Sequence, residues 1–388
     1  MTDPVIAIVP DGFKGCMSSF EAARAIESGL RQGLPKVTTR IIPMADGGEG
    51  TVDAMVTAMS GTRHTVRVCG PLGQSVEAMF GLVDHGHTAL LEMASASGIA
   101  LLAPGERDCM GAHTLGTGEL IRAALDRGVK KIILGLGGSA STDGGTGMAR
   151  ALGVRFLDHQ GNELPLGGGG LTRLHEIDVS HLDPRIKEVA IIAACDVTTP
   201  LCGPMGAASI FGPQKGATPA MVAALDQGLD QLSRLMAQRL GRAVAHLPGA
   251  GAAGGLGGGL VAFLGAQLQP GAAMVAETIR LRRRLAGVDL VITGEGRLDG
   301  QTLAGKAPAQ VARVAKSLGL PVIAICGIAG PGVEHIHQAG IDAWFVGSST
   351  PLAPEDIPRL GPAMITTCAR RIGLLLNALP SVFKNETR

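Results

Sequence analysis

The hydrophobic pattern at the start of the chain repeats one unit twice. An unbroken apolar run, Val5 to Val9, stops at a turn and is followed by a helical pattern from Phe20 to Gln32. A second run, Thr38 to Met44, stops at a glycine-rich turn and leads into a helical pattern that ends at Met59. Strand, turn and helix in this order predict parallel strands joined by helical crossovers.

The pattern changes after Gly61. Three short runs with strand-like composition, separated by glycine-containing turns, predict an antiparallel meander. From Val288 the pattern of the first sixty residues returns and continues to the end of a final helix. In chain order after Gly61, the predicted strands are 65–69, 75–83, 88–93, 131–134, 189–194, 288–293, 322–326 and 343–346, and the predicted helices are 116–127, 219–240, 307–318 and 357–376.

The similar pattern at the two ends of the chain predicts that both ends build one domain. We therefore predict an α/β protein in which residues 1–62 and 276–388 form a Rossmann-like parallel-sheet domain. A second, mixed α/β domain, residues 63–275, is inserted into it. The uncharged stretch from Leu247 to Ala276 is rich in glycine and contains prolines, so its hydrophobicity is low for a membrane span. We interpret it as a glycine-rich loop followed by one buried helix.

Composition narrows the classes of function. Lys plus Arg is 34 and Asp plus Glu is 33, so the chain lacks the basic excess that a nucleic-acid partner requires. The 58 glycines predict tight turns and close backbone approaches, and the scarcity of aromatic residues (8 Phe, 1 Trp, no Tyr) argues against base stacking as a main binding device. Seven scattered cysteines without a C-x-x-C pair are typical of free thiols in the cytoplasm.

Charged residues and glycines gather at three predicted strand ends of the outer domain. In open parallel sheets, ligands bind beyond the carboxyl ends of the strands, so these groups are expected to share one crevice. Glycine lets a ligand approach the backbone, and the charged groups can hold phosphate or a divalent metal. The alternative is that each carboxylate caps the next helix. The three ends are Asp11–Gly15, Asp46–Thr51 and Gly294–Asp299.

The inserted domain contains a glycine-rich segment, Gly135 to Gly145, directly after a predicted strand. Gly135, Gly137 and Ala140 match the dinucleotide fingerprint, and Asp158 lies about 20 residues farther on. With 58 glycines in 388 residues, three glycines at this spacing arise about once by chance, so the match alone carries no weight. Its position after a strand, with hydroxyl groups and an acid, favours a loop whose N–H groups bind phosphate.

Three further segments carry candidate chemistry. Gly300 to Ala307 nearly matches the Walker A pattern, but Ala307 replaces the hydroxyl residue that would bind Mg²⁺. We therefore reject a Walker A loop and keep Lys306 as a candidate phosphate contact. Asp196 follows a predicted strand and is the best candidate for a general base, with turn capping as the alternative. Lys215 lies in a turn and is interpreted as a solvated side chain.

Seven segments, in this order along the chain, resemble the bacterial type I glycerate kinases. The resemblance covers essentially the whole chain, and the ordered set is far more specific than any single glycine loop. The segments are Asp11–Gly15, Pro43–Thr51, Gly135–Gly145, Cys195–Val197, Phe211–Ala217, Pro248–Leu256 and Val291–Arg297.

The resemblance implies transfer of the γ-phosphoryl group of ATP to D-glycerate, giving 2-phosphoglycerate, with Mg²⁺ and with the active site in the cleft between two α/β domains. On this basis Asp196 accepts the proton of the substrate hydroxyl, Lys14 stabilises the transferring phosphate oxygens and Arg297 clamps the glycerate carboxylate. Asp46, Glu49 and Glu295 hold Mg²⁺, while Gly137, Gly138, Ser139, Asp143 and Lys306 bind the nucleotide phosphates.

The sequence departs from the usual pattern of that family at four positions. The family usually has Ser where this chain has Gly12 and Cys16, and Asn where it has Thr142 and Thr199. These changes affect individual contacts rather than the class of reaction. A cytoplasmic monomer or homodimer that binds D-glycerate and ATP, without nucleic-acid or membrane partners, is expected. The alternatives are an NAD-dependent oxidoreductase of small hydroxy acids and a non-catalytic sensor of small acids.

Overall fold

The computed structural model describes residues 3–48, 50–303, 305–348 and 353–379. Its contacts divide the chain into two compact units. The domain boundaries predicted above remain a prediction, because the units are defined by contacts alone. Unit 1 comprises Met1–Asp46, Asp53–Ala58 and Ala272–Arg388, and unit 2 comprises Gly47–Val52 and Met59–Gly271.

Unit 1 is built on a five-stranded sheet in which every neighbouring pair of strands is parallel. The strand order is β13-β12-β11-β1-β2. Strand β2 therefore lies on one side of β1, and β11, β12 and β13 follow on the other side. Such a reversal opens a crevice at the carboxyl ends of the strands. The strands are β1 (Val5–Pro10), β2 (Thr38–Ile41), β11 (Leu290–Leu298), β12 (Val322–Ala329) and β13 (Ala343–Val346).

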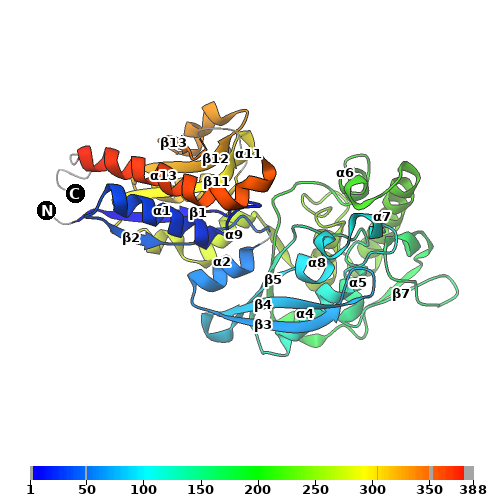
Figure 1. Cartoon of the computed structure of the whole chain (residues 1–388). Helices are drawn as coiled ribbons and strands as arrows, with labels where there is room; N and C mark the ends of the chain where they lie inside the picture. The colour runs from blue at the N-terminus through cyan, green and yellow to red at the C-terminus, as the bar shows by residue number, and fades with distance from the viewer. Residues whose placement is uncertain (1–2, 49, 304, 349–352, 380–388) are drawn as a thin grey trace. The chain divides into compact units, whose positions relative to one another are not determined.

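Two helices that are far apart in the sequence, α1 (Ser19–Gly33) and α13 (Ile357–Ala378), pack side by side in unit 1 (Figure 1). A Cβ atom at Gly29 would lie 2.1 Å from the Thr366 carbonyl oxygen, so the contact requires glycine. A capping box formed by Ser18 and Glu21 starts α1. The other helices of this part of the chain are α2 (Thr51–Ala58), α9 (Gly271–Thr278), α10 (Leu281–Arg284), α11 (Gly300–Leu303) and α12 (Ala307–Lys316).

Unit 2 contains a mixed six-stranded sheet with the order β10-β9-β6-β5-β4-β3. Strands β3, β4 and β5 form the predicted antiparallel meander. Strands β6, β9 and β10 run parallel to β5. The strands are β3 (Thr62–Cys69), β4 (Ser75–Val83), β5 (Thr88–Glu92), β6 (Lys131–Gly135), β9 (Ala190–Ala194) and β10 (Gln267–Gln269), with β7 (Arg155–Leu157) and β8 (Glu176–Asp178) in a separate pair.

The helices of unit 2 pack on this sheet through one continuous apolar core. The longest of them that the structure describes, α7, starts behind a Thr218 cap and ends at Gly241, whose φ of 66° terminates it. The helices are α3 (Ala94–Ser97), α4 (Leu115–Leu125), α5 (Thr146–Ala151), α6 (Ala207–Phe211), α7 (Pro219–Leu240) and α8 (Leu256–Leu264).

The predicted fold class is confirmed, and two local predictions are wrong. Strand β11 continues through Leu298, because Glu295 and Arg297 stay in register with Cys326 and Ile328 of β12. The stretch 247–276 holds not one helix but α8, the short strand β10 and most of α9. Three-residue strands such as β10 are set by pairing with a neighbour and leave almost no pattern in the sequence.

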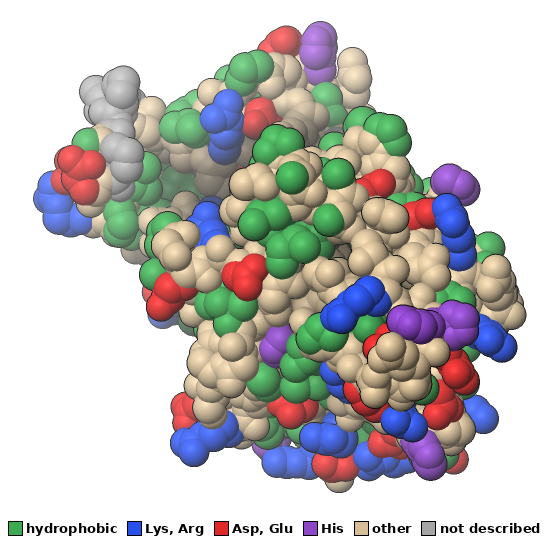
Figure 2. All heavy atoms as spheres, turned by 90° about the vertical axis from the view of Figure 1, so that its right-hand side faces the viewer, with side chains coloured by type: hydrophobic (Ala, Val, Ile, Leu, Met, Phe, Trp, Pro, Cys, Tyr) green, Lys and Arg blue, Asp and Glu red, His purple; other side chains and the backbone are tan. Residues whose placement is uncertain are grey.

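The surface agrees with the balanced composition. On the face shown in Figure 2, Lys and Arg side chains lie among Asp and Glu side chains, so positive and negative charges neighbour each other there. Among the helices of the described residues, none combines the length and the apolar character needed to cross a bilayer.

Candidate active site

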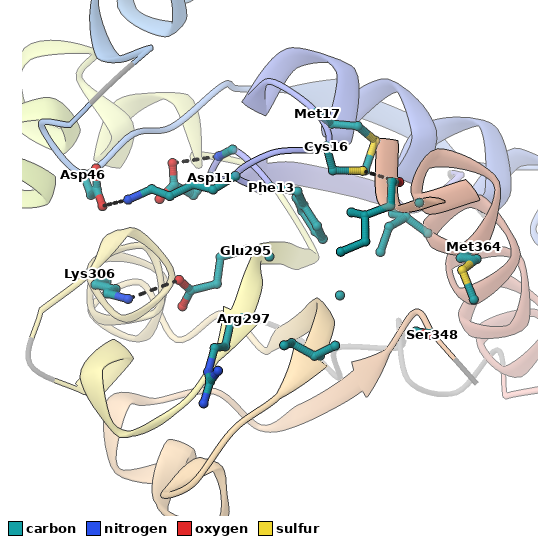
Figure 3. A pocket seen from close by; sticks show the side chains of 18 residues that line it. Asp11, Phe13, Cys16, Met17, Asp46, Glu295, Arg297, Lys306, Ser348 and Met364 are labelled. Carbon is teal, nitrogen blue, oxygen red and sulfur yellow. Dashed lines mark hydrogen bonds and ion pairs between the residues drawn. The ribbon is translucent and has the colours of Figure 1, made fainter. Parts of the chain in front are cut away.

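A pocket of about 440 Å³ lies in unit 1, at the carboxyl ends of β1, β11 and β12 (Figure 3). The ends of β1 and β11 adjoin, because Pro10 pairs with Gly294 and the Asp11 N–H donates to the Gly294 carbonyl at 2.8 Å. This adjacency brings two of the three predicted charged segments together. Asp46 of the third segment also lines the pocket.

Lys14 reaches the pocket from a tight turn after β1. The Phe13 N–H donates to the Met17 carbonyl at 2.8 Å, and Gly15 takes a φ of 73° that closes the turn. The Lys14 ammonium lies 3.9 Å from the Asp46 carboxylate, and its side chain is 79 % exposed. Such an exposed, loosely paired ammonium is available to an anionic ligand.

Three carboxyl groups, of Asp11, Asp46 and Glu295, line the same pocket. Burial, followed by the neighbouring charge of Asp46, raises the pKa of Asp11 to about 8. Burial also raises the pKa of Glu295, although Thr302 donates a 2.6 Å hydrogen bond to its carboxylate. A cation among these oxygen atoms would favour their charged forms.

Two further cations border the carboxylates. The Lys306 ammonium lies 3.9 Å from Glu295 and belongs to the residue that precedes helix α12, whose N-terminal N–H groups favour anions. Arg297 points from the end of β11, and its Nε donates to Asp299 at 3.0 Å. The pocket therefore combines positive groups for phosphate or carboxylate with carboxylates for a metal ion.

The predicted Mg²⁺ ligands are only partly placed. Asp46 and Glu295 line the pocket, and Glu49 lies outside the described residues. Within the described ranges no group of three or more His, Cys, Asp or Glu side chains is arranged to hold a metal ion. Mg²⁺ in kinases takes one or two carboxylates and completes its shell with phosphate oxygens and water, so the two carboxylates fit such an ion. The metal set remains a prediction.

The glycine-rich loop follows β6 in unit 2, as predicted. Its Gly137 and Gly138 face solvent, whereas Ser139 and the residues from Ser141 to Asp143 are buried. The Asp143 carboxylate accepts hydrogen bonds from the N–H and hydroxyl of Thr114 and from the N–H groups of Gly145 and Gly147. Asp143 therefore stabilises the buried part of the loop, and Gly137 and Gly138 form its exposed part.

The interpretation of Lys215 as a solvated side chain is wrong. Its side chain is only 2 % exposed, and its ammonium donates to the Ser139 hydroxyl at 2.8 Å and to the Ser141 carbonyl at 2.5 Å. Burial lowers the pKa of Lys215 to about 7. The lysine therefore stabilises the buried side of the glycine-rich loop through these two hydrogen bonds. The sequence gives no signal of this, because the turn carrying Lys215 is buried only by tertiary packing.

Asp196 lies at the end of β9, the neighbour of β6, in the same sheet as the loop. The side chain is exposed, and one carboxylate oxygen accepts the Gly271 N–H at 2.7 Å. This bond fixes the carboxylate at the rim of the sheet. The structure thus gathers Lys14, Asp46, Glu295, Arg297 and Lys306 in unit 1, and Asp196 with the loop in unit 2.

The glycines after Asp46 serve close packing in unit 2. A Cβ atom at Gly47 would lie 2.9 Å from Ala194 Cβ, and its φ is 91°. A Cβ atom at Gly135 would lie 2.8 Å from the Gly47 carbonyl oxygen. The segment 47–48 therefore rests on the carboxyl ends of β6 and β9, next to Asp196.

This contact predicts that Gly135→Ala lowers the free energy of unfolding by about 1–3 kcal/mol, the usual cost of overpacking. Gly105→Ala is the matched control, because nothing lies within 4 Å of a Cβ atom there. Urea unfolding followed by circular dichroism measures both variants. Equal stability of the two variants would contradict the tight packing of segment 47–48.

The dinucleotide fingerprint lacks the strand arrangement that dinucleotide binding requires. Asp158 follows β7, which pairs with β8 in a separate two-stranded sheet rather than with β6. In a dinucleotide-binding fold the acidic residue ends the strand adjacent to the glycine loop. The NAD-dependent alternative thus loses its structural basis.

A five-stranded parallel sheet with a charged pocket at its carboxyl ends, joined to a mixed α/β unit, defines an α/β enzyme suited to anionic substrates. The model of the glycerate kinase family matches residues 6–377. The chain is 48% identical over 370 residues to glycerate kinase of Halalkalibacterium halodurans, covering 95% of this chain and 97% of that protein.

The chain is also 48% identical over 340 residues to glycerate 2-kinase of Escherichia coli, covering 88% and 89% of the two chains. A crystal structure of a protein assigned as glycerate kinase 2 from Salmonella typhimurium superimposes with a TM-score of 0.89 at 46% identity, covering 97% of this chain and 99% of that one. The chain belongs to the glycerate kinase family. This confirms the resemblance and the predicted enzyme class, an ATP-dependent small-molecule kinase.

Proposed function

We propose that this chain transfers the γ-phosphoryl group of ATP to the C2 hydroxyl of D-glycerate, giving 2-phosphoglycerate and ADP. The observation that carries the proposal is the pocket of unit 1, where cations and carboxylates meet at the ends of parallel strands in a member of the glycerate kinase family. The name of the Escherichia coli relative, glycerate 2-kinase, supports the C2 position.

In this proposal Lys14 and Lys306 neutralise the phosphate oxygens, because phosphoryl transfer depends on positioning and charge neutralisation rather than covalent chemistry. Arg297 clamps the glycerate carboxylate with its planar guanidinium. Gly137, Gly138 and Ser139 present N–H groups to phosphate, and Asp143 keeps that loop in shape. Asp196 takes the proton of the attacking hydroxyl.

Asp46, Glu49 and Glu295 would hold Mg²⁺, alone or through water. The ion would supply charge neutralisation between the nucleotide phosphates and the protein. The raised pKa of Glu295 and of Asp11 supports a role for a cation here, since both carboxyl groups are buried beside other acids. Asp11 faces the pocket next to these residues and adds a further carboxylate.

We place the transfer in the cleft between the two domains. The glycines after Asp46 support this placement, because Gly47 follows Asp46 directly in the chain and packs beside Asp196 within unit 2. We further propose that the protein works in the cytoplasm as a monomer or homodimer. Seven free cysteines agree with a reducing compartment.

A coupled assay for ADP release tests the reaction. We expect ADP to form only when ATP, D-glycerate and Mg²⁺ are all present, and an excess of EDTA to abolish the signal. L-Glycerate serves as the matched control substrate and should support little turnover. Reduction of NAD by glycerate without ATP, or binding of glycerate without ADP release, would replace the proposal with the oxidoreductase or the sensor.

A further inference from the structure

The pocket of unit 1 has two chemically different ends (Figure 3). Asp46, Glu295, Arg297 and Lys306 occupy one side, which we call the charged end. Phe13, Cys16, Met17 and Met364 occupy the other. We call this second region the apolar end and define it by Phe13, Met17, Ile328, Ile357, Met364 and Ile365.

The apolar end exposes hydrophobic surface through Ile328, Ile357 and Met364, whereas Phe13, Met17 and Ile365 are buried behind it. Ile328, just beyond the part of β12 that pairs with β13, is 50 % exposed although it lines the pocket. Each square ångström of such surface removed from water is worth roughly 25 cal/mol, so a ligand with apolar faces gains affinity here. The volume, about 440 Å³, falls within the range of pockets that bind drug-sized ligands.

Glycerate does not fit the apolar end chemically. It is a small molecule with a carboxylate and two hydroxyl groups, and it offers almost no apolar surface to Met and Ile side chains. Burying those polar groups against hydrocarbon would cost free energy without compensating hydrogen bonds. The occupant must be flat or bulky, apolar on its faces, and linked to negative charge that reaches the charged end.

The first turns of α13 build the far wall of the apolar end. The Cys16 thiol donates a 3.3 Å hydrogen bond to the Ile357 carbonyl at the start of this helix. A Cβ atom at Gly361, one turn on, would lie 2.3 Å from Cys16 Sγ. The thiol and the glycine therefore hold the helix close to the turn that carries Lys14. Burial raises the pKa of Cys16, which keeps the thiol protonated as a donor.

We propose that the apolar end binds the adenine ring of ATP, with the triphosphate running toward Lys14 and Lys306 at the charged end. The inference rests on the proposed kinase function and adds to it the domain and the residues that hold the base. Adenine has two apolar faces, is uncharged at neutral pH, and is joined to a polyanion, as the two ends require. The exposed side chains that would contact its faces are Met and Ile, because Phe13, the aromatic residue of the apolar end, is only 3 % exposed.

Two variants test the base site. Met364→Trp fills the apolar end, and Ile328→Gln places a polar but uncharged group at its exposed edge, where folding is least affected. Ile328 is in register with Arg297, so this choice adds no charge beside that residue. We expect each to raise the KM for ATP and the Kd for adenosine by at least about tenfold, with the KM for glycerate unchanged. Leu375→Trp is the control, because this residue of α13 is 48 % exposed and does not line the pocket.

Adenosine binding by calorimetry separates this inference from the proposed function. Adenosine that binds wild type and neither variant supports the base site even if glycerate is not phosphorylated. Wild-type values of both the ATP KM and the adenosine Kd in the two variants would overturn it, as would a rise in the glycerate KM equal to that for ATP. If circular dichroism shows that Met364→Trp does not fold, Ile328→Gln decides alone.

Discussion

Asp196→Asn is expected to lower kcat by at least about 10²-fold while ATP still binds, because that factor is the usual contribution of a general base. Asparagine keeps an oxygen that can accept the Gly271 N–H, which donates to the Asp196 carboxylate at 2.7 Å, so the local fold is retained. The amide cannot take the proton of the substrate hydroxyl. Steady-state kinetics and ATP binding by calorimetry measure the two effects separately.

The matched control is Asp230→Asn, which removes a carboxylate from an exposed ion pair with Arg234 on α7. This variant should keep wild-type kcat. Turnover of Asp196→Asn within a fewfold of wild type would remove Asp196 from the role of base. Loss of ATP binding together with turnover would instead mean that the carboxylate organises the site.

The stability difference between wild type and Lys215→Met is expected to depend strongly on pH. In the folded protein burial lowers the pKa of Lys215 from 10.5 to about 7. Below pH 7 the lysine is charged in both the folded and the unfolded chain, and the folded protein bears the full cost of burying the charge. Between pH 7 and 10.5 the unfolded chain binds more protons, so wild-type stability rises with pH.

Methionine cannot titrate, so the wild type should gain about 4 kcal/mol on the variant between pH 6 and pH 10. Urea unfolding across this range measures the difference, and groups common to both proteins cancel. Lys187→Met, at an exposed position, is the control and should show no such trend. Parallel stability curves for wild type and Lys215→Met would show that the buried lysine does not lose its proton.

Much of the fold could be predicted because it is encoded in local periodicity. The helices α1, α7 and α13 and the meander β3 to β5 have clear apolar spacing, and the structure places them where the pattern does. The return of the first pattern at Val288 also predicted that both chain ends share one parallel sheet, as the order β12-β11-β1-β2 confirms. The extension of β11 through Leu298 was not predicted. Its glycines interrupt the apolar pattern, and the strand continues there because it pairs with β12.

The grouping of the charged residues in one pocket could be predicted where they lie at strand ends, but the contacts that depend on tertiary packing could not. Lys14, Asp46 and Glu295 follow or end apolar runs, and the rule on carboxyl ends of parallel strands sufficed to group them. Lys215 could not be recognised, since burial of a lysine depends on partners from other segments. The apolar end could not be predicted for the same reason. Met17, Ile328 and Met364 lie far apart in the sequence, and each alone is an ordinary hydrophobic residue.

The phosphorus NMR spectrum of the product formed from ATP and D-glycerate tests the central claim most directly. Phosphate on the C2 oxygen couples to one carbon-bound proton, so we predict one new monoester signal split into a doublet, together with the signals of ADP. A triplet would place the phosphate on C3, and growth of inorganic phosphate alone would mean hydrolysis of ATP. Either result would contradict transfer to the C2 hydroxyl of glycerate.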